Sequence, residues 1–171
     1  TLEDGQEGIR VIGQGFSKEE RAEELVGFQQ DIMAYFETKK AALEGKAKPK
    51  VLYLRDGDLK VAGGAAVNTM MIETAGGVNV AKDVQGQWTP VTMEQIAAWD
   101  PDVIILSDFD PIQPADLFED KLEGQNWKNI KAVREGRVYK APNGLYRWDA
   151  PCVETPLMIK WIAQKLHPDV F

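Results

Sequence analysis

The 171-residue chain predicts an α/β fold with three layers, in which helices cover both faces of a mostly parallel sheet and one long helix precedes the sheet. Two observations predict this fold. From residue 50 onward, short apolar runs of strand length alternate with segments of helical periodicity, which is typical of a parallel, doubly wound sheet. Before residue 50, one apolar stripe at helical spacing continues from residue 17 to residue 44.

The long helix has both a start signal and a stop signal. Ser17 and Glu20 have the spacing of a capping box, and Gly45 followed by Pro49 would end the helix. Its apolar positions are Ala22, Leu25, Val26, Ile32, Met33, Phe36 and Leu43. At 1.5 Å per residue this helix would be roughly 40 Å long, which indicates a strut rather than a local packing element. Residues 1–16 resemble the tail of another element whose packing partners lie elsewhere.

The alternating elements follow in order after residue 50. Strands are expected at 51–55, 78–81, 103–106 and 137–141, and helices at 66–75, 92–99, 114–122 and 155–166. Thr92 and Gln95 form a second capping box, and Pro114 suits the first turn of a helix. The continuous apolar run at 103–106 is expected of a strand buried on both faces.

Composition restricts the class of protein. Hydrophobic residues make up 44% and charged residues 27% of the chain, a balance typical of globular domains. The net charge of −7 argues against a nucleic-acid partner, because phosphates need clusters of Lys and Arg. No apolar run reaches the length of about 18 residues that spans a membrane, and no signal peptide is visible. Because Thr1 is not an initiator methionine, the absent signal says little about the compartment.

The sequence contains no motif of a known catalytic or metal site. The patterns H-E-x-x-H, G-x-S-x-G, C-x-x-C and Walker A do not occur. Cys152 and His167 are each the single residue of their type without partners at ligand spacing, and His167 is expected at the surface. The pairs Asp56/Asp58 and Asp108/Asp110 could hold a divalent cation, but aspartates in such loops more often stabilise turns. We therefore expect a protein that is not an enzyme, with no resident metal or cofactor.

The loops that follow the predicted strands carry the candidate ligand-binding residues. In open α/β sheets, ligands bind beyond the carboxyl ends of the strands. Residues of this kind in or beside those loops are Trp88, Phe109, Tyr146, Arg147 and Trp148. Aromatic faces together with a guanidinium suit a bulky, partly anionic ligand. The alternative is that Trp88 and Trp148 fill the edges of a small core.

Four segments of the chain, in the same order, resemble the class III periplasmic binding proteins of iron-siderophore, haem and cobalamin ABC importers. They are Ile72–Ala81, Val91–Ile96 followed by Asp100–Leu106, Asn129–Tyr139, and Glu154–Leu157 together with Leu166–Phe171. The resemblance covers residues 17–171. It implies two Rossmann-like lobes joined by one long helix, with the ligand held between the lobes.

The resemblance also implies a division of the chain and a function. Residues 1–16 would be a remnant of the N-terminal lobe, 17–45 the interlobe helix, and 46–171 the C-terminal α/β lobe, so most of the first lobe would be missing. The protein would be the substrate-binding component of an importer for an iron complex or a corrinoid. It would be periplasmic, or an extracytoplasmic lipoprotein, and would dock onto an ABC permease at the membrane surface. Glu94 matches a glutamate that in this family pairs with arginines of the permease.

Other functions remain open at this point. Trp88 lies six residues before Glu94, as does an aromatic residue that lines the pocket of cobalamin binders, but the local order Trp88-Thr89-Pro90 differs from that type. The same family could bind an oxyanion such as molybdate. A Rossmann-like chelatase-type or nitrogenase-type enzyme fragment is a further alternative, as is an interaction or sensory domain with the same fold. The sequence does not identify the ligand.

Overall fold

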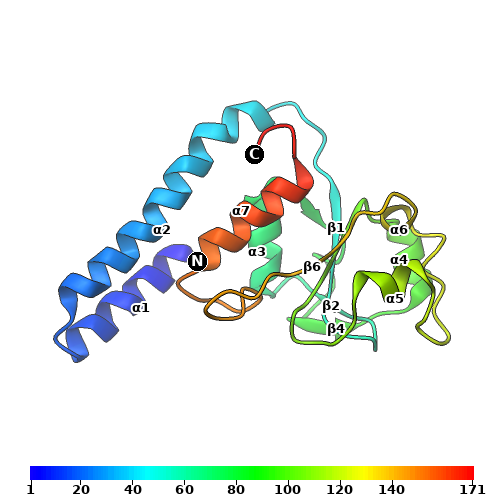
Figure 1. Cartoon of the computed structure of the whole chain (residues 1–171), viewed down its shortest axis with the longest axis horizontal. Coiled ribbons are helices and arrows are strands. Elements are labelled where there is room, and N and C mark those ends of the chain that lie inside the picture. The colour runs from blue at the N-terminus through cyan, green and yellow to red at the C-terminus, as the bar shows by residue number, and fades with distance from the viewer.

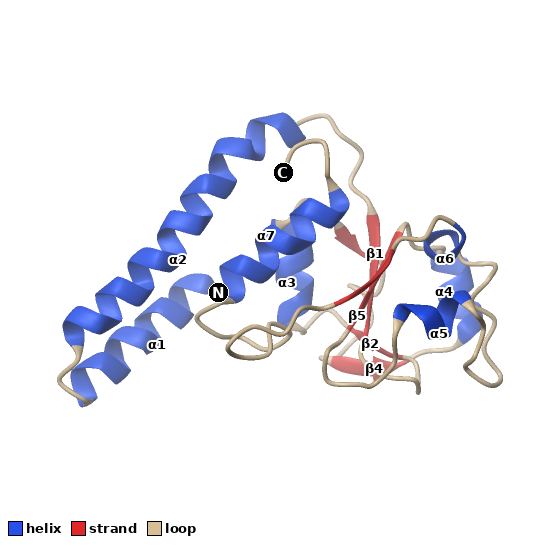
Figure 2. Ribbon diagram, in the orientation of Figure 1, coloured by secondary structure: helices blue, strands red, loops and turns tan.

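The fold is a three-layer α/β sandwich with a helical hairpin on one side. The computed structural model describes residues 1–171, apart from the side chain of Lys40. In chain order the elements are α1 (Leu2–Gly15), α2 (Glu19–Lys40), the 3₁₀ turn Ala41–Leu43, β1 (Lys50–Leu54), β2 (Lys60–Ala62), α3 (Val67–Thr74), β3 (Val78–Asn79), β4 (Trp88–Pro90), α4 (Met93–Trp99), β5 (Val103–Leu106), α5 (Pro114–Phe118), α6 (Lys131–Arg134), β6 (Val138–Lys140) and α7 (Thr155–Leu166). The sheet separates α3 and α7 from α4, α5 and α6, and the hairpin of α1 and α2 lies on the α3/α7 side (Figures 1 and 2).

The sheet is mixed, with a parallel part that reaches one edge and an antiparallel part that reaches the other. The strand order is β4-β2-β1-β5-β6, and β3 pairs with the start of β1. Strands β1, β5 and β6 are parallel, with Val51 opposite Val103, whereas β2 and β4 are antiparallel. The expected α/β class is confirmed, and residues 103–106 are buried as the apolar run predicts. The sequence analysis does not predict β2 and β4, which have three residues each and pair antiparallel with β1 and with each other. Trp88 therefore lies in a strand rather than in the expected loop.

Both ends of the long helix differ from the prediction. Helix α2 begins at Glu19 without a side-chain cap, so the predicted capping box of Ser17 and Glu20 is wrong. Ser17 instead lies in the tight turn between α1 and α2, where its φ is 51° and the next amide, of Lys18, donates to Gly13 at 2.8 Å. The helix ends at Lys40, ahead of the predicted stop. Its 22 residues extend about 33 Å at 1.5 Å per residue, so the strut is shorter than expected.

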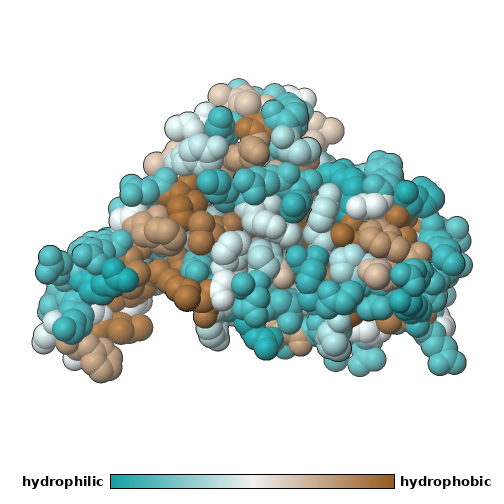
Figure 3. Space-filling view, in the orientation of Figure 1, coloured by the Kyte–Doolittle hydropathy of each residue, from teal (hydrophilic) through white to brown (hydrophobic). Residues whose placement is uncertain are grey.

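Residues 1–16 form a helix of their own rather than the tail of another element. Helix α1 begins with a capping box between Thr1 and Asp4, and Arg10 ties it to Glu23 of α2 at 2.7 Å. Apolar side chains gather along α1 and beside it, as the brown surface in Figure 3 shows. Val11, Ile12 and Phe16 are among the exposed ones. None of the helices that the structure describes has both the length and the hydropathy needed to cross a bilayer.

Two apolar layers hold the sandwich together. One layer lies between the sheet and the helices α2, α3 and α7, and it contains Tyr53 and Phe36. Phe36 of α2 stacks on Phe171 with 4.9 Å between ring centres, so the long helix is fixed to the end of the chain. The other layer surrounds Trp127 and packs α4, α5 and α6 on the opposite face. His167, expected at the surface, is buried with its Nε2 at 3.2 Å from the carbonyl of Gly76.

Candidate ligand-binding site

A hollow of about 450 Å³ lies at the carboxyl end of the parallel strands. Its wall combines the residue after β1, the start of α3, the beginning of β4, the loop after β5 and the segment before α7. The lining residues are Thr1, Arg55, Ala65, Ala66, Val67, Asn68, Met70, Gln87, Trp88, Phe109, Asp149, Ala150 and Pro151. The hollow thus lies where the topology of an open α/β sheet places ligands.

Arg55 and the rings of Trp88 and Phe109 form one wall of this hollow, and Arg147 lies beside it. The guanidinium of Arg55 lies 5.0 Å from the ring centre of Trp88 and 5.5 Å from that of Phe109. The guanidinium of Arg147 lies 4.3 Å from the Phe109 ring. Among the described residues no carboxylate forms an ion pair with either guanidinium. Their hydrogen-bond donors therefore remain available, and a ligand with carboxylates or other anionic oxygens would suit them.

A buried carboxylate fixes three segments around the hollow. Asp149 is 3% exposed and accepts hydrogen bonds from the Tyr53 hydroxyl at 2.7 Å, from the Asp108 amide at 2.9 Å and from the Ser107 hydroxyl. The side-chain amide of Asn68 donates to the Asp149 carbonyl at 3.2 Å. These bonds join β1, α3 and the loop after β5 to the segment before α7. Burial, followed by the negative charge of Asp149, raises the pKa of Tyr53 well above its usual value, so the phenol stays a donor.

Asp108 lies beside this carboxylate and has no donor of its own. Both of its carboxyl oxygens are buried without a hydrogen-bond partner among the described residues. Burial, followed by the negative charge of Asp149, raises the pKa of Asp108, whereas Arg147 and Lys140 act in the opposite direction. The hydrogen-bonded carboxylate of Asp149 thus lies beside the carboxyl group of Asp108, whose charged form is disfavoured by burial and by that neighbour.

Lys140 holds the loop that carries Phe109. Its ammonium donates to the carbonyls of Ser107 at 2.6 Å and Ile112 at 2.8 Å, and also to that of Asp110. Burial lowers the pKa of Lys140, although the acidic neighbours partly oppose this. One cation thus caps three carbonyls of a single loop, which fixes the position of the Phe109 ring.

The predicted ligand-binding residues do not all reach the hollow. Trp88 and Phe109 line it, whereas Arg147 does not and lies over the ring of Phe109. Tyr146 is 58% exposed. Trp148 packs against the core on the α7 side, and its Nε1 donates to Glu154 at 2.9 Å. This position agrees with the alternative interpretation, in which Trp148 fills an edge of the core. The binding role of these residues stays a prediction.

The structure adds residues that the prediction omitted. Arg55 is the first residue after a predicted strand. The rule that ligands bind beyond strand ends could therefore have added it to the predicted ligand-binding residues. Met70 looks like an ordinary core residue of an amphipathic helix, although it lines the hollow. Asp149 directly follows the Tyr146–Trp148 cluster, but no local pattern separates a buried aspartate from an exposed one. Its importance comes from Tyr53, which is distant in the sequence.

Glu94 has the exposure that its predicted docking role requires. The capping box of α4 is confirmed, with the Gln95 amide donating to the Thr92 hydroxyl at 3.3 Å and the Thr92 amide donating to Gln95 at 2.9 Å. Glu94 lies in the first turn of this helix with its carboxylate in solvent. Hydrogen bonds from its main chain, followed by one from Thr92, lower the pKa of Glu94, so it is ionised at neutral pH. Docking on a permease stays a prediction.

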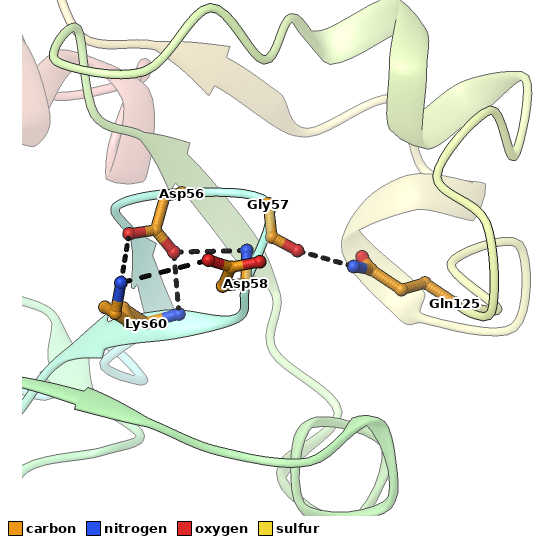
Figure 4. Close-up of polar contacts among 5 residues, drawn as sticks. All are labelled: Asp56, Gly57, Asp58, Lys60 and Gln125. Atoms are coloured by element: carbon orange, nitrogen blue, oxygen red, sulfur yellow. Dashed lines mark hydrogen bonds and ion pairs between the residues drawn. The ribbon is translucent and has the colours of Figure 1, made fainter.

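The acidic turn after β1 is held by internal bonds. Asp56 accepts from the amides of Asp58 and Lys60 at 3.2 and 3.3 Å, and the Lys60 ammonium lies 3.2 Å from Asp56 (Figure 4). The side-chain amide of Gln125, from another loop, donates a hydrogen bond to the Gly57 carbonyl at 2.6 Å. Within the described part of the chain, no group of three or more His, Cys, Asp or Glu side chains is arranged to hold a metal ion. These aspartates therefore serve the turn.

Comparison with known proteins places this geometry in context. A family model described as "Periplasmic binding protein" matches residues 1–145. The chain is 28% identical over 172 residues to the molybdate-binding protein MolA of Haemophilus influenzae, which covers 97% of this chain and 46% of that protein. It is 29% identical over 143 residues to the high-affinity heme uptake system protein IsdE of Staphylococcus aureus, which covers 81% of this chain and 48% of that protein. The chain thus spans about half the length of these curated relatives.

Solved structures agree with the sequence matches. A periplasmic solute binding protein from Veillonella parvula is 58% identical and superposes with a TM-score of 0.91, over 99% of this chain and 51% of that one. The structure of MolA bound to molybdate is 27% identical with a TM-score of 0.80, over 97% of this chain and 50% of that one. The likeness therefore extends over the whole described fold.

Proposed function

Because the chain belongs to the periplasmic binding protein family, we propose that it forms the C-terminal half of the substrate-binding component of an ABC importer. The ligand would be a bulky, partly anionic metal chelate, either an iron siderophore or haem, or a corrinoid. The observation that carries this proposal is the group of Arg55, which lines the hollow, and Arg147, which lies behind the ring of Phe109: two guanidiniums beside an aromatic ring. Stacking would hold the body of the chelate, and the guanidiniums would pair with its anionic oxygens.

The rest of the complete protein would cover the opposite side of the hollow. Two facts support a second lobe: the chain spans about half of its curated relatives, and α1 exposes Ile12 and Phe16 in a way that is unusual for a finished surface. In this proposal α1 belongs to the N-terminal lobe, α2 is the interlobe helix, and residues 46–171 are the C-terminal lobe. The protein would act outside the cytoplasm without catalysis, and Glu94 would dock on the permease.

Molybdate or a similar oxyanion is the second candidate ligand. The similarity to MolA over 97% of the chain supports it, and two guanidiniums also suit a small oxyanion. The aromatic rings favour the larger chelate, because a tetrahedral oxyanion makes little use of a ring face.

Titrations of the complete binding protein test these alternatives. Haemin, a ferric tricatecholate complex and molybdate are each titrated while tryptophan fluorescence is followed. We expect one of these probes to bind, and Arg55→Gln and Arg147→Gln to weaken it at least roughly tenfold each, in line with the loss of a charge-assisted bond. Arg134→Gln, at the exposed end of α6, is the matched control and should change nothing. Unaltered affinity in both Arg55→Gln and Arg147→Gln would refute the proposed site.

A further inference from the structure

The carboxyl group of Asp108 is buried next to the wall of the hollow. Asp108 directly precedes Phe109, whose ring lines the hollow, and its own amide donates to Asp149 at 2.9 Å. Both of its carboxyl oxygens are buried without a hydrogen-bond partner among the described residues. Because buried polar atoms in proteins are nearly always hydrogen-bonded, these two oxygens are an exception.

The neighbouring hydroxyl and ammonium donors are already used. Tyr53 of β1 and Ser107 each have one hydroxyl hydrogen, and both donate it to Asp149. Lys140 of β6 has three ammonium hydrogens, and it donates to three carbonyls of the loop after β5. None of these groups can turn to Asp108 without breaking a bond that it makes now. The ionised form of Asp108 therefore lacks the hydrogen bonds that would stabilise a buried charge.

Titratable groups from three other segments face this carboxyl. Asp149 and Arg147 belong to the segment before α7, Lys140 belongs to β6, and the phenol of Tyr53 comes from β1. Burial, followed by the negative charge of Asp149, opposes the ionisation of Asp108 and raises its pKa. Arg147, followed by Lys140, favours ionisation. The charge state of Asp108 thus depends on a balance in which Arg147 is the larger cationic influence.

Arg147 connects Asp108 to the ligand site. Its guanidinium lies 4.3 Å from the ring centre of Phe109, and that of Arg55 lies 5.5 Å from the same ring. An anion held by these guanidiniums would add negative charge near Asp108 and offset the positive charge of Arg147. Binding of an anion and protonation of Asp108 therefore favour each other, because such a coupling is reciprocal.

We propose that Asp108 sets the charge preference of the ligand site: its ionised form weakens the binding of anions, and a bound anion causes it to take up one proton. The inference rests on the proposed function and deepens it, because it assigns the site an anionic ligand whose affinity rises as the pH falls. The proton comes from the solvent and binds to a carboxyl oxygen. Asp108 acts through its charge and does not touch the ligand, since both oxygens are buried.

Two sulfonates test the inference in the complete binding protein: benzenesulfonate and the dianion benzenedisulfonate. Both combine an aromatic ring with anionic oxygens, and neither changes its charge between about pH 4 and pH 7, where aspartates titrate. Calorimetry at constant ionic strength, in buffers of different ionisation enthalpy, measures affinity and proton uptake. We expect benzenesulfonate to bind at least roughly threefold more tightly at the lower pH, and the dianion to show a larger ratio, because the coupling grows with the charge of the ligand.

Asp108→Asn is the deciding variant, because asparagine is neutral at every pH and has the shape of the protonated acid. At pH 7 it should bind both sulfonates about as tightly as the parent protein does at the lower pH, and the proton uptake should disappear. Asp83→Asn, at an exposed position, is the control and should keep the pH dependence of the parent. Arg55→Gln should weaken both sulfonates and keep the ratio between the two pH values. Thermal melts confirm that each variant is folded.

A measurement on the parent protein keeps the inference testable if Asp108→Asn is unstable. Carbon NMR of the carboxyl groups follows the titration of Asp108 with and without saturating benzenedisulfonate. The midpoint should rise when the dianion is bound. It should also rise in unliganded Arg147→Gln, which lacks the opposing positive charge.

The possible failures differ between the two proposals. If Arg55→Gln weakens sulfonate binding but the pH dependence is the same in Asp108→Asn and the parent, the role of Asp108 is overturned and the proposed function stands. A midpoint of Asp108 that saturating benzenedisulfonate does not move would overturn it in the same way. If neither sulfonate binds at either pH, the anionic site is refuted, and the role of Asp108 is refuted with it.

Discussion

The hydroxyl of Tyr53, in the central strand β1, donates to the carboxylate of Asp149 at 2.7 Å, and both side chains are buried. This bond connects the middle of the sheet to the segment that precedes α7. The same carboxylate also accepts from Ser107 and from the amide of Asp108. The positions of the segments that form the walls of the hollow therefore depend on the side chain of Asp149.

Asp149→Ala should strongly destabilise the fold. The change leaves two buried donors and one half-buried donor unpaired. Each such group costs about 1–3 kcal/mol, so we expect a loss of at least about 3 kcal/mol in the free energy of unfolding. Tyr53→Phe removes one donor together with its bond and should cost only about 1 kcal/mol. Urea denaturation measures both. Asp83→Ala, at an exposed position, is the control. Equal stability of Asp149→Ala and the parent protein would contradict the role of this carboxylate.

Asp108→Asn should flatten the pH dependence of stability. The folded-state pKa of Asp108 is raised, so the folded protein binds this proton more tightly than the unfolded chain does. The resulting stabilisation is complete below the ordinary aspartate pKa of about 4 and is lost as the pH rises through the higher folded-state value. The asparagine variant cannot titrate and should lose less stability between pH 4 and neutrality.

Urea denaturation at a series of pH values between these limits makes the comparison, with Asp83→Asn as the control. A steeper pH dependence in Asp108→Asn than in the parent would show that the sign is wrong.

Lys140→Met should loosen the loop that carries Phe109. The variant leaves three carbonyls without their shared donor, so the amides of residues 107–112 should exchange hydrogen faster, while those of β5 change less. Stability should fall by about 1–3 kcal/mol. Lys140→Arg, which keeps the charge, should retain part of the protection. Lys82→Met, at an exposed position, is the control. Hydrogen exchange read by mass spectrometry is the measurement, and unchanged protection of residues 107–112 would count against the role of Lys140.

Glu94→Arg should impair transport without changing ligand affinity. The carboxylate is exposed at the start of α4, and a reversed charge would repel the arginines that the resemblance places on the permease. Transport into vesicles that contain the permease measures the first quantity, and a ligand titration measures the second. Glu73→Arg, on α3, makes the same charge change at another exposed site. A tenfold loss of ligand affinity in Glu94→Arg would show that this residue belongs to the binding site instead.

The two capping patterns show how far local sequence could predict this fold. Thr92 and Gln95 form the expected box, whereas Ser17 and Glu20 have similar spacing and do not. The difference is tertiary, because Ser17 lies between two helices packed against each other and takes the left-handed backbone of that turn. Periodicity identified the strands and helices that pack on the sheet through several residues. It missed β2 and β4: β2 is held by pairing with β1, and β4 by pairing with β2, rather than by a pattern of their own.

The candidate site could be predicted in the same uneven way. Topology places Phe109 and Arg147 after parallel strands, and both lie at the hollow or beside it. The position of Trp148 depends on Glu154, which accepts a hydrogen bond from its indole N–H. The rule that ligands bind beyond strand ends does not predict that contact. Asp149 acts through Tyr53 and Ser107, which are distant in the sequence, so only the folded chain shows it.

The outer strands of the sheet have a consequence for how the described chain behaves when it is isolated. β4 and β6 are the edge strands at the two ends of the strand order, and each has three residues. β4 ends in Pro90, which is exposed and whose nitrogen has no hydrogen to donate. A short edge strand that ends in proline is a poor template for the pairing of a further strand. The β4 edge therefore resists the addition of a strand from a second molecule, and self-association of the isolated chain is expected at the apolar face of α1 instead.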